Sequence, residues 1–421
     1  MKKIMREFLE LNPPEKFWEE IKSFLKTKII KTEKINLDNA LSRVLADDIY
    51  SPIDLPPFSR STVDGYAVKA ADTAGASASM PSYFKLIGSI KMGEKTELKL
   101  KSGEAAAIPT GGMLPEEADA VLMIEDTEKI NQNTIESFKS LAVGENLVQK
   151  AEDIAADELL FKKGHKLMAR DIGALAGLGV TEFEGFKRAE VSVISTGDEL
   201  ISAEADARAG QIRDINSYSI SAYLSKMGAE TKKVGIIEDD FESLKTALKN
   251  ELDKDLVLIS GGSSVGIKDM TIDLLNSLGK PGVLLHGLAI KPGKPTILAV
   301  IDGTIVIGLP GHPASAWTVN SVLVAEIVRV LNGEKEAAEI GIPNNKYLIK
   351  AELTRGFVSD KGREEYIPVK VQRDNDKLLA DPLLGKSSLI TNLAYGDAVL
   401  KVPRTQEGKE KGEIVELMLI E

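Results

Sequence analysis

The chain has 421 residues, of which 43% are hydrophobic and 28% charged, a composition typical of a soluble globular protein with more than one domain. A net charge of −11 argues against a general binder of nucleic acids or acidic membranes, and the absence of cysteine excludes disulfides, thiolate zinc sites, iron–sulfur clusters and thiol nucleophiles. The N-terminus lacks the apolar core of a secretory signal and no apolar run approaches 18 residues, so we expect a cytoplasmic protein with no membrane span.

The N-terminal part begins with helical patterns. Phe17, Ile21 and Phe24 recur at helical spacing and predict an amphipathic helix over 14–26. A second helix is predicted at about 38–48, where apolar residues again fall on one face.

From residue 51 to residue 158 the helical pattern is replaced by short β-like runs with many glycines and prolines. Helical spacing returns over 167–180, where Gly179 is suited to end the helix. The region 51–158 is therefore predicted to be a small β-rich domain inserted into a helical one.

Residues 189 to 333 alternate between strand-like and helical runs. Asn216 and Asp240 each precede a helical run and are suited to cap it, and a long final helix is predicted over about 313–331. This βαβ series predicts a mostly parallel sheet. The strand-like runs are 191–194, 234–237, 256–259 and 305–307.

The tail from about residue 340 is again rich in β-like runs. We therefore predict a multidomain α/β and β protein with four parts. The parts are an N-terminal helical or extended domain at 1–50 and 159–188, the inserted β-rich domain at 51–158, an α/β domain at 189–335 and a C-terminal β domain at 336–421.

Five short loops between residues 196 and 315 carry most of the functional information. Each follows a strand-like run and is rich in Gly, Pro, Lys, Ser or acidic residues. Loops at the carboxyl ends of parallel strands share one crevice, which is where open α/β sheets bind ligands. The loops are 196–199, 238–240, 260–266, 291–295 and 308–313.

The loop at 260–266 is the strongest single motif, because an apolar strand leads into it and a helix is predicted from about Met270. Glycines let the backbone approach a ligand, and a helix N-terminus offers free amides to an anion. It matches neither the Walker pattern nor the dinucleotide fingerprint, and a purely structural turn remains an alternative. The candidate ligand-binding residues are Ser260, Gly261, Gly262, Ser264 and Gly266.

Two further loops offer groups to an anion. Two lysines flank a rigid Pro-Gly turn, which suits a phosphate or another tetrahedral oxyanion, although a solvated turn would have the same sequence. Two prolines precede the final helix, whose first turn contains a serine able to donate to an anion. The candidate residues are Lys291, Lys294, Pro310, Pro313 and Ser315.

Carboxylates at or just after strand ends form a third group. They can hold magnesium against phosphate oxygens or orient a hydroxyl, and magnesium is favoured because any metal here must take oxygen ligands. For Asp240 a helix N-cap is the favoured interpretation. Among the histidines only His312 lies in one of the loops, and no Ser–His–Asp arrangement is supported. The other acidic candidates, for which both interpretations stay open, are Asp198, Glu199, Asp239 and Asp269.

Ordered sequence blocks extend this pattern over nearly the whole chain, at 64–68, 110–112, 118–121, 152–154, 196–200, 210–216, 260–266, 291–295 and 308–313. Together they resemble the MoeA family of molybdopterin molybdenumtransferases, which is related to the E domain of gephyrin. Related adenylyltransferase and CinA-like families share the blocks at 196–200 and 260–262. The Asp-Gly-Tyr-Ala-Val block at 64–68 and the C-terminal domain separate this chain from them.

The resemblance implies a MogA-like α/β domain that binds molybdopterin, a barrel-like C-terminal domain and the activity of a molybdenum insertase. Adenylylated molybdopterin and molybdate are the implied substrates. Molybdenum enters the dithiolene, the pyrophosphate link is cleaved with Mg²⁺, and AMP leaves. Glu199, Asp239 and Asp269 are implied to serve the magnesium ion and the pterin phosphate.

The resemblance also implies residues outside the five loops. Arg363 and Ser387, with Lys291, Lys294 and Ser315, are implied to receive the oxyanion. The family forms an elongated homodimer whose clefts draw on both chains, so three residues of the inserted domain are implied to act in trans: Asp64, Thr110 and Asp153. A molybdopterin adenylyltransferase and apo-molybdoenzymes are the expected partners, and nucleic acid and membrane are not.

The chain departs from the family pattern at three positions. Ala151 and Lys386 stand where glycine is usual, and His312 stands where asparagine or tyrosine is usual. Three alternatives stay open: a tungstate-specific homologue, a molybdopterin adenylyltransferase and a non-catalytic scaffold of the gephyrin E type. Because a scaffold would not need the acids and lysines, their presence favours chemistry, and Asp269→Ala is predicted to abolish cofactor formation without dissociating the dimer.

Overall fold

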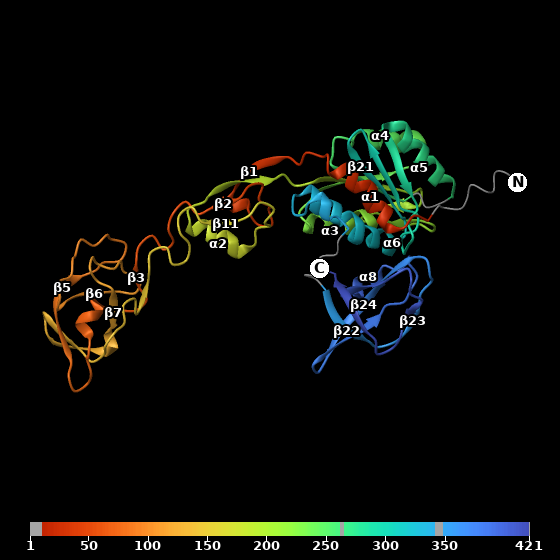
Figure 1. Cartoon of the computed structure of the whole chain (residues 1–421). Helices are drawn as coiled ribbons and strands as arrows, with labels where there is room; N and C mark the ends of the chain where they lie inside the picture. Colours follow the sequence, from red (N-terminus) through yellow and green to blue (C-terminus); the bar gives the residue numbers. More distant parts are fainter. Residues whose placement is uncertain (1–10, 262–264, 342–347, 421) are drawn as a thin grey trace. The chain divides into compact units, whose positions relative to one another are not determined.

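The computed structural model describes residues 11–261, 265–341 and 348–420, with the backbone alone at 265–269 and at residue 392. Contacts divide the chain into two compact units. The first consists of 1–33, 42–46 and 185–421, and the second of 34–41 and 47–184. Each unit is built around its own buried core (Figure 1).

The second unit is dominated by a six-stranded sheet of order β7-β4-β6-β5-β9-β8. Its buried side chains include Tyr66, Phe84 and Ile135; Phe84 alternates with exposed residues along β5, whereas β4, which carries Tyr66, is buried throughout. The β-rich character predicted for this region is therefore confirmed. The strands are β4 Gly65–Val68, β5 Ser82–Ser89, β6 Glu104–Ile108, β7 Ala120–Met123, β8 Thr127–Asn131 and β9 Thr134–Ser137.

Short elements flank this sheet. Helix α2, Ala169–Gly177, confirms the helix predicted at 167–180, and Gly179 follows it with a φ of 73°, the left-handed conformation that ends a helix. The remaining elements of the segment are β1 Thr32–Asn36, η2 Leu37–Asn39, β2 Ile49–Tyr50, β3 Arg60–Ser61, η3 Ala70–Thr73, η4 Ile124–Asp126, β10 Leu147–Val148, β11 Leu159–Phe161 and β12 Glu182–Phe186.

The helix predicted at 38–48 is wrong. Only the 3-10 turn η2 forms there, and Ser42 has a φ of 62°, which no residue inside a right-handed helix can have. Leu45 instead makes an isolated β-bridge to Gly185. The apolar spacing reflects burial of single residues in an extended segment.

The α/β domain contains a six-stranded sheet of order β16-β13-β17-β21-β20-β18. The first four strands are parallel, β20 is antiparallel to both of its neighbours, and the predicted mostly parallel sheet is confirmed. The strands are β13 Glu190–Thr196, β16 Glu230–Ile237, β17 Leu256–Gly261, β18 Pro281–His286, β20 Ile297–Ile301 and β21 Thr304–Leu309. Two short strands, β14 Leu200–Ile201 and β15 Ile212–Arg213, pair beside it.

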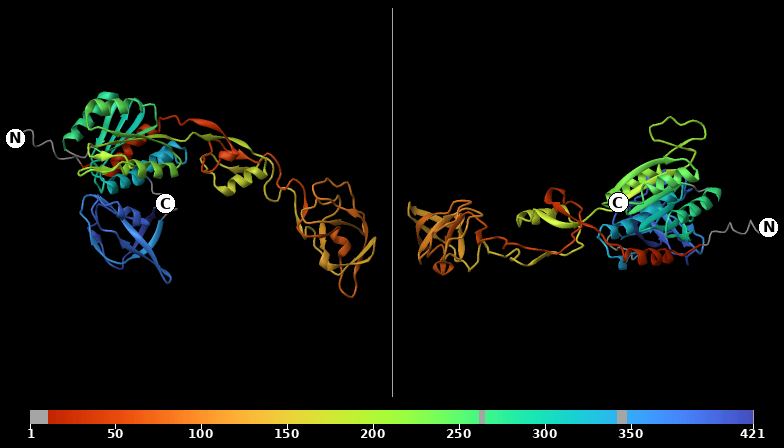
Figure 2. Two further views of the ribbon diagram at one scale, coloured as in Figure 1. Left: turned by 180° about the vertical axis from the view of Figure 1, so that it is seen from behind. Right: turned by 90° about the horizontal axis from the view of Figure 1, so that it is seen from above.

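Helices cover both faces of this sheet (Figures 1 and 2). Leu256 and Leu258 face a core shared with α1, α3, α6 and α7, while Val257 and Ile259 face one shared with α4 and α5. This alternation explains why the strand is apolar throughout. The helices are α1 Pro14–Leu25, α3 Asn216–Lys226, α4 Phe241–Lys249, α5 Val265–Leu278, α6 Pro313–Val319 and α7 Ala325–Leu331.

Helix ends test the capping predictions directly. Asp240 accepts hydrogen bonds from two amides of α4 and is the predicted N-cap. Asn216 is not a cap, because it is already the first residue of α3, and Asp214 accepts from the Ser217 amide instead. Helix α5 begins at Val265, earlier than the predicted Met270.

The predicted helix over 313–331 forms, with a π-helical segment, η5 Asn320–Val324, between α6 and α7. Its length and apolar composition would suffice for a membrane span, but 72% of its most apolar window is buried inside the protein. It is therefore placed as a core helix of the α/β domain.

The C-terminal region forms a closed barrel. Strands β24, β25, β22, β28 and β26 pair in that order, and β26 returns to β24, which confirms the barrel-like fold. The strand β19, Ile290–Lys291, leaves the α/β domain and pairs in parallel with β24. The other elements are η6 Ala337–Glu339, β22 Leu348–Leu353, β23 Phe357–Val358, β24 Glu364–Asp374, β25 Lys377–Pro382, α8 Thr391–Tyr395, β26 Ala398–Val402, β27 Gly408–Lys409 and β28 Ile414–Leu419.

Candidate functional site

The five predicted loops meet at one edge of the α/β sheet. Strands β13, β16, β17 and β21 run parallel and end there, so the loops that follow them share that edge. Strand β18 ends at the same edge and β20 begins there, which brings the 291–295 loop to it as well. The predicted convergence of loops follows from this strand order.

Asp239 is an acid at this edge whose pKa is raised above its ordinary value. Its carboxylate accepts a hydrogen bond from the Thr196 hydroxyl, and its amide lies 3.3 Å from a carboxylate oxygen of Asp198. Burial raises the pKa of Asp239, and the charges of Asp198 and Glu199 raise it further, against the opposing hydrogen bond from Thr196. Asp239 and Glu199 therefore lie in one acidic cluster, as predicted.

Gly261 keeps this cluster in place. It has a φ of 137°, and a Cβ atom there would lie 1.8 Å from the carbonyl oxygen of Thr196. Only glycine permits this approach between β17 and β13. The conformational demand predicted for the glycine-rich loop is met at this position.

The acidic cluster suits a hard cation. Repulsion among the carboxylates of Asp239, Asp198 and Glu199 would fall if a divalent ion lay beside them. Within the described residues no group of three or more His, Asp or Glu side chains is already arranged to hold a metal. The side chain of Asp269, the third predicted ligand, is outside the described part.

The predicted cations differ in their surroundings. The ammonium of Lys291 lies 2.9 Å from Glu365 and 3.5 Å from Asp360 of the C-terminal domain, and Arg363 lies 2.8 Å from Asp360. Lys294 is exposed, and no carboxylate of the described residues lies within ion-pair distance of it. Lys294 is thus the loop cation best placed to take an anionic ligand.

Two polar residues that the sequence reasoning did not assign to the site connect its loops. The side-chain amide nitrogen of Asn216 lies 2.8 Å from the Ser260 hydroxyl and 2.9 Å from the Gly311 carbonyl oxygen. Asp214 accepts a hydrogen bond of 2.7 Å from Ser195 on β13. Their presence among the family-like blocks was the only sequence signal for them.

The loop at 308–313 joins the C-terminal domain to this edge. Pro310 is buried and Pro313 begins α6, in whose first turn Ser315 is buried. The Ser387 carbonyl oxygen accepts a 3.1 Å hydrogen bond from the Ala314 amide. Ser387 therefore lies beside this loop, and its implied role in receiving the oxyanion stays a prediction.

Three predicted residues belong to the second unit and are described within it. Asp64 accepts hydrogen bonds from the Thr110 amide at 2.7 Å and the Thr110 hydroxyl at 2.9 Å. These two bonds, the amide first, lower the pKa of Asp64. Asp153 is exposed, and Ala151 before it has a φ of 62°, a left-handed conformation that favours glycine.

Four predicted site residues are not described in full. Gly262 and Ser264 lie outside the described residues. Gly266 and Asp269 fall in the first turns of α5, where the backbone alone is described.

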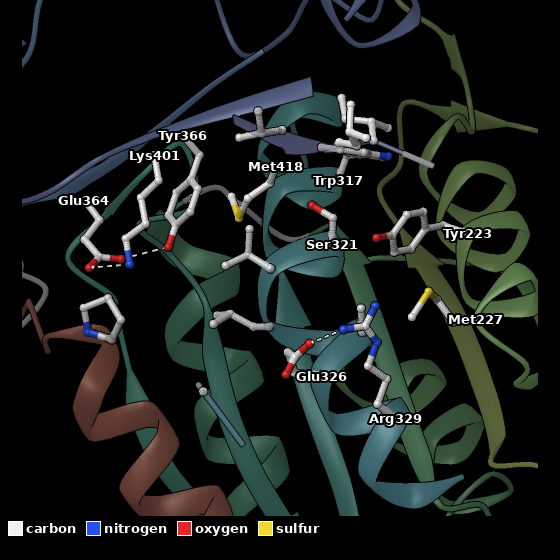
Figure 3. Close-up of a pocket in the computed structure, with 18 of the residues that line it drawn as sticks. Tyr223, Met227, Trp317, Ser321, Glu326, Arg329, Glu364, Tyr366, Lys401 and Met418 are labelled. Atoms are coloured by element: carbon white, nitrogen blue, oxygen red, sulfur yellow. Dashed lines mark hydrogen bonds and ion pairs between the residues drawn. The ribbon is translucent and has the colours of Figure 1, made fainter. Parts of the chain in front are cut away.

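A large cavity of about 290 Å³ lies elsewhere in the first unit, between the helices of the α/β domain and the barrel (Figure 3). Tyr223, Trp317 and Met418 line its middle. The charged groups at its ends are paired with one another, Glu364 with Lys401 at 3.0 Å and Glu326 with Arg329 at 2.8 Å. It shares no residue with the predicted site, whose chemistry we therefore place at the sheet edge.

Three family models match successive parts of the chain. The MoeA N-terminal region (domain I and II) matches residues 14–179, a probable molybdopterin binding domain matches 192–330, and the MoeA C-terminal region (domain IV) matches 350–420. The three matches follow the order of the parts predicted from the sequence.

Full-length relatives extend these matches. A putative molybdopterin biosynthesis protein of Methanocaldococcus jannaschii is 31% identical and aligns over 99% of this chain and all of its own length. A molybdopterin molybdenumtransferase of Bacillus subtilis is 32% identical over 93% of this chain and 90% of its own. The crystal structure of a MoeA protein from Pyrococcus horikoshii has a TM-score of 0.82 and 39% identity, covering 97% of this chain and 99% of that one. The chain belongs to the MoeA family of molybdopterin molybdenumtransferases.

Proposed function

We propose that this protein inserts molybdenum from molybdate into adenylylated molybdopterin and releases AMP. Membership of the MoeA family assigns it to molybdenum cofactor biosynthesis, with molybdopterin and molybdate as substrates. The single observation that carries the finer proposal is that one sheet edge holds both an acidic cluster and a lysine, Lys294, with no carboxylate of the described residues within ion-pair distance.

The substrates explain why both charges are needed. Molybdate and a phosphorylated pterin are anions, so they require ammonium, guanidinium and amide donors. Lys294 offers an exposed ammonium that no carboxylate of the described residues pairs with. The dithiolene sulfurs belong to the substrate, so the absence of cysteine is no obstacle.

Magnesium would suit the acidic cluster. Asp239 and Glu199, with Asp269, would hold it, and a bound Mg²⁺ would supply charge stabilisation at the phosphate link that is cleaved. Thr196 orients Asp239 by its hydrogen bond. A cation bound beside Asp239 would reduce the repulsion between its carboxylate and the charge of Asp198, which favours cation binding.

We further infer a homodimer in which Asp64, Thr110 and Asp153 of one chain serve the cleft of the other. Mixing Asp64→Asn and Asp239→Asn proteins tests this arrangement. If the clefts are shared, a mixed dimer has one intact site, and random mixing restores about a quarter of the wild-type activity. If each cleft uses only its own chain, mixing restores none.

The function itself is tested by cofactor transfer. Purified protein, adenylylated molybdopterin, Mg²⁺ and molybdate should together activate an apo-molybdoenzyme, and the Asp269→Ala variant should not while remaining a dimer. Activation by tungstate alone would favour the tungstate-specific homologue. Adenylylation of molybdopterin from ATP would favour the adenylyltransferase, and tight binding without turnover would favour the scaffold.

A partner that adenylylates molybdopterin and acceptor apo-molybdoenzymes belong to the same proposal, as does a cytoplasmic location. They follow from the substrate and product that this reaction needs. Activity of Asp269→Ala equal to that of the wild type would show that the site assignment is wrong.

A further inference from the structure

Besides the contacts of Lys291 with Asp360 and Glu365, the C-terminal domain meets the cleft edge at Ser387, which makes two contacts with the loop before α6. Its carbonyl oxygen accepts the Ala314 amide at 3.1 Å, and its hydroxyl oxygen lies 3.0 Å from Nδ1 of His312. The first contact fixes the Ser387 backbone. In the second contact, either the imidazole or the hydroxyl can be the donor, and only this direction remains to be assigned.

The backbone on both sides of this contact is held. The His312 carbonyl oxygen accepts the Ala316 amide at 2.9 Å, and the Gly311 carbonyl oxygen accepts from Asn216. On the barrel side, a turn closes with the Leu389 amide donating to the Lys386 carbonyl oxygen at 3.0 Å. The imidazole and the hydroxyl are therefore presented to each other by two ordered loops.

The loop that makes this contact neighbours the loop of Lys294, which has no ion-pair partner among the described residues. Strand register sets Ile297 of β20 opposite Gly308 of β21, so the loop carrying Lys294 and the loop carrying His312 leave neighbouring strands at the same edge. His312 is exposed there. An oxyanion attracted by Lys294 would meet the Ser387 hydroxyl at the same edge.

A serine hydroxyl has one hydrogen to donate, and a neutral imidazole also has one. If Ser387 donates to Nδ1, its hydroxyl offers only lone pairs to the cleft and repels an oxyanion. If Nδ1–H donates to Ser387, the hydroxyl hydrogen is free for the oxyanion. The direction of this single hydrogen bond therefore decides whether Ser387 attracts or repels the ligand.

We propose that His312 is a positioning residue for oxyanion binding, whose Nδ1–H donates to the Ser387 hydroxyl and thereby directs the serine hydrogen toward molybdate. This inference rests on the proposed function, because it takes the cleft ligand to be molybdate. His312 itself does not have to touch the ligand.

Binding of molybdate alone, measured by calorimetry without pterin, separates the possibilities. Asparagine at position 312 places an amide N–H at the same bond separation from Cα as Nδ1–H, whereas aspartate places only an acceptor there. We expect His312→Asn to bind like the wild type. His312→Ala and Ser387→Ala should each weaken binding about 10-fold, the value of one hydrogen bond to a charged group.

Two comparisons make the test specific. His312→Asp should bind at least as weakly as Ser387→Ala, because the carboxylate would accept the serine hydrogen. The double variant His312→Ala/Ser387→Ala should be no weaker than Ser387→Ala alone, since His312 acts through Ser387. Ser388→Ala, an exposed serine on the same turn, is the matched control and should bind normally.

Wild-type affinity in His312→Asp, losses that multiply in the double variant, or no molybdate binding by the wild type would each overturn the inference. Circular dichroism and gel filtration identify any variant that fails to fold, and His312→Asn then carries the comparison. Because the readout is binding, a wild type that binds molybdate but releases no AMP would refute the proposed function and leave this inference standing.

Discussion

The same pair of residue types occurs twice in this molecule with opposite electrostatic results. In the second unit Asp64 accepts a hydrogen bond from the hydroxyl of Thr110, and in the α/β domain Asp239 accepts one from the hydroxyl of Thr196. The pKa of Asp64 is lowered, whereas that of Asp239 is raised.

The difference lies in what surrounds each pair. Asp64 is exposed and also accepts the Thr110 amide, which stabilises its charged form. Asp239 is partly buried beside Asp198 and Glu199, which destabilise its charged form. The surroundings of Asp64 stabilise its carboxylate, whereas the carboxylate of Asp239 would be stabilised by a bound cation. The two residues are therefore suited to different roles.

The largest loss of stability should come from Gly261→Ala, because Gly261 lies against Thr196, the residue that donates to Asp239. The new Cβ would lie 1.8 Å from the Thr196 carbonyl oxygen at a φ of 137°, so β13 and β17 must separate. We expect a loss of about 3 kcal/mol or more in unfolding free energy, measured by denaturant titration. Gly173→Ala, with open space around the new Cβ, is the control and should not destabilise. Equal stability of the two variants would contradict the strain.

The next effect separates charge from shape at Asp239. Asp239→Asn keeps an acceptor for Thr196 but removes the cation-binding charge, so Mg²⁺-dependent activity should fall about 100-fold or more. Its thermal midpoint at neutral pH should be unchanged or slightly raised, because repulsion from Asp198 and Glu199 disappears. A stability loss at neutral pH would mean that the carboxylate is not electrostatically strained.

The comparison is sharpest in a titration of the two carboxyl groups by carbon NMR. Asp64 should titrate below the ordinary pKa of 3.8 and Asp239 above it. By linkage, the Asp64 contacts add stability above pH 3.8 that is lost as the pH falls through the folded pKa of Asp64. For Asp239 any such stability is present below pH 3.8 and is lost as the pH rises through its folded pKa. Shifts in the same direction would remove the distinction.

The smallest effect is expected beside Asp153. Ala151 has a φ of 62°, so Ala151→Gly should relieve strain and raise the unfolding free energy by at most about 1 kcal/mol, offset in part by the greater entropy of the unfolded chain. Thermal unfolding of the wild type and the variant measures this. Ser42→Gly, at the same φ of 62°, is a matched comparison, and a clear loss of stability in both would contradict the strain.

Asp240 and Asn216 illustrate how far sequence reasoning reached. Both precede a helical run, and both were predicted to cap it. Capping by Asp240 is a local interaction, and it was predicted correctly. Asn216 instead contacts Ser260 and Gly311, residues 44 and 95 positions away, and no local pattern reports such contacts.

The candidate site likewise combines features that were predictable from the sequence with features that depend on distant contacts. Convergence of the loops was predictable because parallel strands must end at one edge. The pairing of the two lysines was not predictable, because Lys291 is paired by Glu365 and Asp360 of a domain some seventy residues further along, whereas Lys294 has no such partner in the described part of the chain. The predicted helix at 38–48 failed for a related reason, since Val44 and Leu45 are buried by contacts with distant residues, such as the bridge from Leu45 to Gly185.

One measurement tests the central claim most directly: release of AMP from adenylylated molybdopterin by the purified protein with Mg²⁺, with and without molybdate. We predict that AMP is released only when molybdate is present and that Asp239→Asn abolishes this release. Tight binding of the substrate with no AMP released, by molybdate or tungstate, would contradict it and favour a non-catalytic scaffold.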